Sequence, residues 1–85
     1  MEILEILEEL NPEAYLVDNC NEAIVGISAN HFHHENVLAV YDIEKIIQIL
    51  MKDGMSREGA REFFEFNIQG SYFGKNTPLF VDFYR

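Results

Sequence analysis

Carboxylates are the most numerous side chains in this 85-residue chain that could do chemistry, and they are unevenly distributed. The first 44 residues carry ten carboxylates and no Lys or Arg, whereas the remaining 41 carry five carboxylates and six bases, so the net charge of −9 arises in the N-terminal half. Such a surface repels nucleic acid and membrane phosphate and attracts basic partners. The alternative is a solvated face that serves only solubility. We predict that the protein docks on the basic surface of a partner and does not bind nucleic acid or membrane directly. The residues predicted to dock are Glu2, Glu5, Glu8, Glu9, Asp18 and Glu22.

Metal and catalytic chemistry find little support in the residue pattern. The stretch HFHH supplies His31, His33 and His34, but zinc sites built wholly from protein usually draw ligands from two separated pairs. We predict a surface loop there and no metal or other cofactor, the alternatives being a metal site or a pH-responsive loop.

The chain has no nucleophile elbow, Walker loop or glycine-rich dinucleotide turn, so no enzymatic activity is expected. The single cysteine, Cys20, excludes an internal disulfide and has no basic neighbour in sequence, which predicts an inert thiol.

Asn67 is a polar residue on an otherwise apolar row. It extends the row of Ala60, Phe63 and Phe64 by one helical turn, which predicts that its amide points toward the core. A buried amide needs hydrogen-bond partners, and the backbone of the turn at residues 71–74 could supply them. The alternative is a ligand pocket lined by Asn67, Tyr72 and Tyr41.

Hydrophobic residues recur at helical spacing in three segments, which predicts helices over residues 2–10, 43–53 and 57–69. Asp42 and Ser56 stand where N-caps are needed, and Gly54 can end the second helix in the left-handed conformation. The side chains expected to face the core are, in chain order, Ile3, Leu4, Leu7, Leu10, Ile43, Ile46, Ile47, Leu50, Ala60, Phe63, Phe64 and Ile68.

Extended apolar runs predict the strands. The turn residues DNCN favour a hairpin between the first two, and Gly26 in the second favours a bulge or a close backbone approach. We expect one α+β domain over residues 1–85, in which a small antiparallel sheet of three to four strands packs against two or three helices. No apolar run is long enough to cross a membrane. The predicted strands are 14–17, 22–28, 37–41 and 79–84.

The segment from Ala39 to Phe83 resembles a family of small, largely uncharacterised proteins encoded by tailed bacteriophages and prophages. The motifs that carry the resemblance are AVYD at 39–42, DGMS at 53–56, EFN at 65–67, GSYFG at 70–74 and TPLF at 77–80. Gly59 and the HFHH stretch depart from the family pattern. The resemblance implies an accessory protein made from a phage or mobile element in the cytoplasm of a host cell, and it transfers no activity.

Resemblance and charge together predict a phage-encoded accessory protein that acts by stoichiometric protein binding. Acidic inhibitors of host defence nuclease complexes, including anti-CRISPR proteins, place carboxylates in a basic nucleic-acid channel, where Lys and Arg can meet them. The partner expected here is the basic surface of a host protein or nucleoprotein complex. The alternatives are a small module that binds or sequesters a nucleotide, and a regulatory or structural phage subunit. An exposed edge strand, or the aromatic residues Phe80, Phe83 and Tyr84, could support a homodimer.

Overall fold

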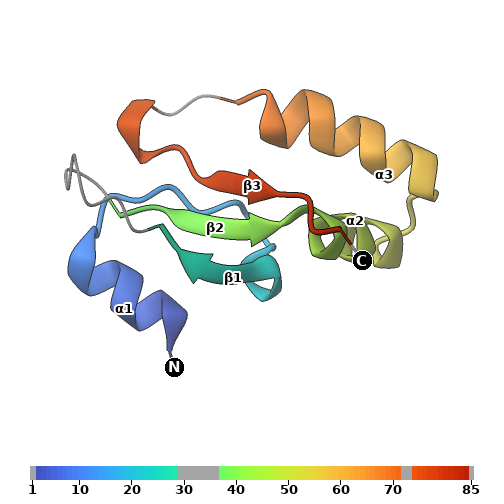
Figure 1. Ribbon diagram of the computed structural model, residues 1–85. Helices are drawn as coiled ribbons and strands as arrows, with labels where there is room; N and C mark the ends of the chain where they lie inside the picture. Colours follow the sequence, from blue (N-terminus) through green and yellow to red (C-terminus); the bar gives the residue numbers. More distant parts are fainter. Residues whose placement is uncertain (1, 29–36, 72–73, 85) are drawn as a thin grey trace.

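A computed structural model describes residues 2–28, 37–71 and 74–84 of the chain. A three-stranded sheet forms its centre, with α1 beside one edge and α3 beyond the other (Figure 1). The predicted α+β class, with three helices and a small sheet, is confirmed. In chain order the elements are α1 (Ile3–Leu10), the 3₁₀ turn η1 (Asn21–Ala23), β1 (Ile24–Ile27), β2 (Ala39–Asp42), α2 (Ile43–Lys52), α3 (Arg57–Phe63), the π-helical segment η2 (Phe64–Gln69), the 3₁₀ turn η3 (Gly74–Asn76) and β3 (Leu79–Val81).

The helix boundaries follow the local signals in the sequence. Asp42 Oδ1 accepts a hydrogen bond from Glu44 N at 3.0 Å, and Ser56 Oγ accepts one from Gly59 N at 3.0 Å, so both predicted N-caps are confirmed. Gly54 adopts a φ of 112° just after α2, a conformation that favours glycine. The predicted third helix is confirmed as α3 continued by η2.

The sheet is mixed, which corrects the expectation that all its strands pair antiparallel. β1 pairs antiparallel with β2, and the register shift between Ile24 and Gly26 places a bulge at Val25, as the glycine predicted. β3 instead runs parallel to β2, with Val40 opposite Leu79. The reason is the connection: α2, α3 and η2 carry the chain away from β2 and back, which a parallel pair requires.

The predicted strand at 14–17, and the hairpin built on it, are wrong. This segment joins no strand ladder. Tyr15 N donates to Asn76 O at 3.1 Å, and Val17 N donates to Tyr41 Oη at 2.8 Å. The backbone donors of the segment are therefore satisfied by a turn and by a side chain, and the chain crosses the sheet on the side to which Tyr41 points.

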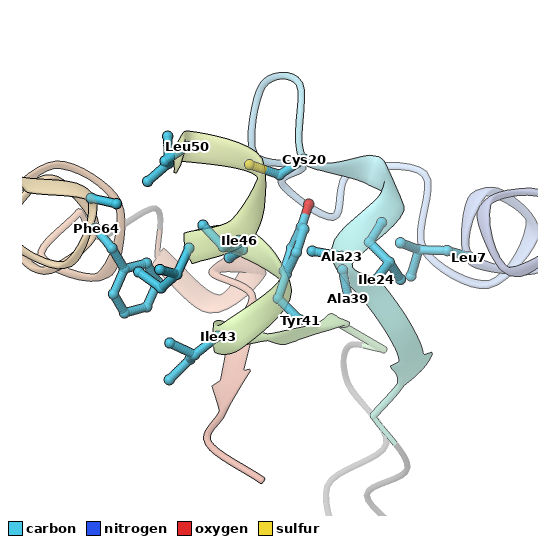
Figure 2. Packing of buried hydrophobic residues seen from close by; sticks show 12 residues of the cluster. Leu7, Cys20, Ala23, Ile24, Ala39, Tyr41, Ile43, Ile46, Leu50 and Phe64 are labelled. Atoms are coloured by element: carbon cyan, nitrogen blue, oxygen red, sulfur yellow. The ribbon is translucent and has the colours of Figure 1, made fainter. Parts of the chain in front are cut away.

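The core surrounds Tyr41 at the centre of β2. Figure 2 shows side chains from α1, α2, η2 and the sheet on both sides of this residue. Tyr41 and Phe80 stack with centroids 5.6 Å apart, and Phe64 meets Phe80 edge to face at 5.3 Å. Aromatic pairs in these arrangements contribute beyond the area they bury. The sheet therefore has one face committed to the core, the face that carries Tyr41 and Phe80.

Three residues predicted to be in the core lie at the surface instead. Phe63 is 38% exposed because Ala60 and Phe64, one helical turn apart, face the sheet and turn Phe63 to the flank of α3. Leu4 and Leu10 are 39% and 56% exposed, because α1 contacts the rest of the protein along a narrow line. Leu7 is the residue of α1 that is buried.

Candidate functional site

The carboxylates of α1 form an uncompensated acidic surface. Glu5, Glu8 and Glu9 are exposed on the helix, and Glu2 at its start is half-buried. Some acids elsewhere are paired: Arg57 binds Glu44 through two contacts of 2.6 and 3.1 Å, and Arg61 lies 3.4 Å from Glu65. Within residues 2–28, 37–71 and 74–84, Glu5, Glu8 and Glu9 form no ion pair. Of the predicted acidic residues at this helix, the structure therefore leaves Glu5, Glu8 and Glu9 available to a partner.

Exposed apolar side chains lie on the same helix, and sequence reasoning missed them. Ile6 and Leu10 are 49% and 56% exposed, and Leu4 is 39% exposed. The signal was present in the composition, because five of the eight residues from Ile3 to Leu10 are apolar, more than one face of a short helix can bury. α1 thus offers exposed apolar contact area beside its carboxylates.

Two shallow depressions border α1. Glu2, Leu4 and Glu5 line one of about 430 Å³ together with Asn21 and Ile24. Leu4 and Glu8 line another of about 360 Å³, whose opposite wall is the extended segment that follows α1. Leu4 belongs to both, so a partner side chain could enter on either side of this residue.

Asp18 and Glu22, the other two predicted partner-binding residues, face a different neighbourhood. Both are exposed. Glu22 lines a depression of about 590 Å³ with Lys45 and Lys52 of α2. Asp18 acts on Cys20, since its negative charge helps to raise the pKa of that thiol. Glu5, Glu8 and Glu9 therefore lie together on α1, with Glu2 just before it, whereas Glu22 lines a depression that also contains two lysines.

The predicted pocket of Asn67, Tyr72 and Tyr41 is not formed. Tyr41 is fully buried in the core, where its hydroxyl accepts the Val17 hydrogen bond. Asn67 is exposed on η2, because the wider π-helical turn shifts the helical phase and brings Ile68 against the core instead. The backbone carbonyl of Asn67 accepts a hydrogen bond from Ser71 Oγ at 3.0 Å. Tyr72 lies outside the described residues.

The side-chain chemistry of Cys20 is suppressed by its surroundings. Its side chain belongs to the core and is 2% exposed. Burial raises the pKa of the thiol, and the negative charges of Asp53 and Asp18 raise it further. Because the thiolate is the reactive form, the thiol is unreactive at neutral pH.

The described parts of the chain contain no group of three or more His, Cys, Asp or Glu side chains suited to hold a metal ion. The HFHH stretch lies outside those parts, so its predicted role as a surface loop is not described. None of the helices in the described ranges is long and apolar enough to cross a membrane.

Comparison with protein-family models, with curated proteins and with solved structures finds no match.

Proposed function

We propose that this protein acts by stoichiometric binding to a basic partner protein, and that α1 is the element that docks. The observation that carries the proposal is the combination on one short helix of three unpaired, exposed carboxylates with exposed apolar side chains. Carboxylates give charge-assisted hydrogen bonds to Lys and Arg, and they steer the approach of a basic surface. The apolar residues Ile6 and Leu10 add contact area that a purely electrostatic encounter lacks.

The resemblance to phage proteins supports a narrower proposal about the partner. In it, the protein is a phage-encoded accessory protein in the host cytoplasm, and its target is a host defence nuclease complex. A channel that holds nucleic acid presents Lys and Arg at short intervals, which matches the spacing of Glu5 and Glu9 one helical turn apart. The protein then works by occupying the channel, without catalysis.

Purified guided-nuclease complexes from bacterial defence systems, titrated with this protein, test the narrower proposal. We expect target cleavage by the matching complex to stop near one molecule per complex. The double reversal E5K/E9K should abolish inhibition, whereas E58K/E62K should retain it. The control is closely matched, because both pairs are exposed, lie one turn apart and begin in the first turn of their helix. Equal inhibition by both variants would exclude α1 as the inhibitory element.

The second candidate, binding of a small anionic ligand, now has a different location from the predicted pocket. The depression beside α2 is lined by Lys45, Lys52, Gln48 and Ile49 together with Glu22, so it offers two cations against one carboxylate, with apolar contact area beside them. Heating the protein with a panel of nucleotides tests this candidate, since a ligand specific for the folded state raises the melting temperature. A rise that is lost in K45A/K52A would favour it over docking through α1.

A further inference from the structure

A groove lies between α1 and the extended segment that follows this helix. It is the depression of about 360 Å³ that Leu4 and Glu8 border, and we name it the Glu8 groove. Its polar lining residues are Glu8 and Asn11, and Glu8 is the charged one of the two. The apolar lining residues come from the helix and from the segment, and they are Leu4, Leu7, Pro12, Ala14 and Leu16. The groove therefore combines apolar contact area with a single carboxylate.

The amide of Asn11 ties the segment to other parts of the chain and is occupied in doing so. Its Nδ2 donates to Val37 O at 2.9 Å and to Asn76 Oδ1 at 3.0 Å, so both N–H groups of the amide are used. Its Oδ1 accepts a hydrogen bond from Glu13 N at 3.2 Å. Glu8, by contrast, is exposed and forms no ion pair within the described ranges. The Glu8 carboxylate is therefore the side-chain group of the groove that is available to a ligand.

The electrostatic potential of the Glu8 groove favours a cation. The groove lies at the last turn of α1, where the backbone carbonyls at a helix end carry a partial negative charge that adds to that of Glu8. Glu5, three residues before Glu8, adds charge of the same sign on the adjoining side of the helix. None of the described residues that line the groove is a Lys or Arg. The apolar walls then favour a cation that is carried on an apolar stem.

We propose that the Glu8 groove receives an arginine side chain of the basic partner, a proposal that rests on docking through α1. The stem of the arginine packs on Leu4 and Leu16, and its guanidinium binds the Glu8 carboxylate through two parallel N–H groups. Lysine also joins an apolar stem to a cation, but its ammonium is a strongly hydrated point charge. A guanidinium is more weakly hydrated and presents two donors to one carboxylate, so it loses less on entering an apolar-walled groove.

The proposal gives the carboxylates of α1 different roles. Glu5 and Glu9 do not line the groove, and they attract a basic surface from a distance, an effect that salt screens. Glu8 acts at contact and decides which cation is preferred. Recognition of the partner then requires an arginine at the place that meets the groove, in addition to positive charge.

Titration of ¹⁵N-labelled protein with N-acetyl-arginine amide, followed through the backbone amide chemical shifts, tests the groove directly. The same titration is repeated with the lysine analogue and with the citrulline analogue, which keeps the length of arginine but has no charge. We expect the arginine compound to shift amides within residues 4–16 and to saturate in the millimolar range, since a single side chain buries little area. It should bind about three- to tenfold more tightly than the other two compounds, because they lack the charge or the paired donors.

Glu8→Gln keeps the size of the side chain and removes its charge. It should weaken binding of the arginine compound by about three- to tenfold and abolish the preference over citrulline. Glu9→Gln is the matched control, because it removes the same charge from the next residue of the same helix without altering the groove, and it should leave binding nearly unchanged. Leu4→Ala should also weaken binding, since it removes part of the wall on which the stem packs.

Equal affinity for the arginine and lysine compounds would overturn the assignment to arginine. Equal losses in Glu8→Gln and Glu9→Gln would overturn the groove as the site, because only the net charge would then matter. Arginine-induced shifts that lie outside residues 4–16 would overturn it as well. The spectra themselves show whether each variant is folded. Docking through α1 is tested by changes at Glu5 and Glu9, which lie outside the groove, so failure of that docking and failure of the arginine site are distinguishable.

Discussion

The hydroxyl of Tyr41 accepts a hydrogen bond from the backbone N–H of Val17 at 2.8 Å, and this contact fastens the segment between α1 and β1 to the central strand. Tyr41 is fully buried, and its ring stacks on Phe80 at 5.6 Å. One residue therefore joins three parts of the chain that are distant in sequence. The same segment is also held by Tyr15 N, which donates to Asn76 O, and by Asn11 Nδ2, which donates to Val37 O.

Tyr41→Phe keeps the ring and removes the acceptor, so it isolates the hydrogen bond. It leaves the Val17 N–H without its partner, and we expect a loss of about 1–3 kcal/mol in the free energy of unfolding. Urea unfolding followed by circular dichroism measures this loss. Tyr84→Phe is the control, because Tyr84 is fully exposed, and it should have no effect. Equal stability of wild type and Tyr41→Phe would show that the contact is dispensable.

Adjacent phenylalanines of α3 and η2 should differ sharply in their contribution to stability. Phe64 is 1% exposed and Phe63 is 38% exposed. Phe64→Ala should cost about 3–5 kcal/mol, as large-to-small changes of core aromatic residues do, whereas Phe63→Ala should cost much less. The melting temperatures of the two variants, each compared with that of the wild type, measure this difference. Similar losses in both would mean that the helix turns a different face to the sheet.

Because Cys20 and Tyr41 are buried, we expect the folded protein to lose stability at alkaline pH. Burial raises the pKa of both groups in the folded state, so the unfolded chain ionises first as pH rises. Their contribution is fully present below the ordinary pKa values of about 8.5 for Cys and about 10 for Tyr, and it is lost as pH rises through the raised values. The melting temperature should hold near neutral pH and fall above about pH 9. Cys20→Ala should make the first part of the fall shallower, and an identical slope in that variant would contradict the assignment.

The same burial predicts slow labelling of the thiol. In native protein, Cys20 should react with a thiol reagent far more slowly than in denaturant, because the group is both covered and protonated. Rapid labelling under native conditions would show that the segment around Cys20 opens readily.

Local signals in the sequence predicted the helices well. Asp42, Ser56 and Gly54 act within a few residues of themselves, through caps and a left-handed φ, so their effect does not depend on the rest of the fold. The bulge next to Gly26 is a further local feature, and the glycine pointed to it. Carboxylates on a short amphipathic helix were equally predictable, because they must lie on the side that is not buried.

Long-range features were harder to predict. The apolar run at 14–17 has the composition of a strand, but its donors bind Asn76 O and Tyr41 Oη, which are far away in sequence. The parallel pairing of β3 depends on where α2 and α3 return the chain. Asn67 was misplaced because a π-helical turn shifts the helical phase, and spacing rules assume a regular α-helix.

The most direct test of docking through α1 is affinity capture from bacterial lysate with wild type, E5K/E9K and E58K/E62K as parallel baits, read by quantitative mass spectrometry. Ile6 and Leu10 stay unchanged in all three baits, so the comparison isolates the charge. We predict that wild type and E58K/E62K enrich the same basic protein or nucleoprotein complex and that E5K/E9K loses it. The enrichment should also decline as salt is raised, because exposed charges are screened over about 8–10 Å at physiological ionic strength. Enrichment that is equal for all three baits and indifferent to salt would contradict docking through α1.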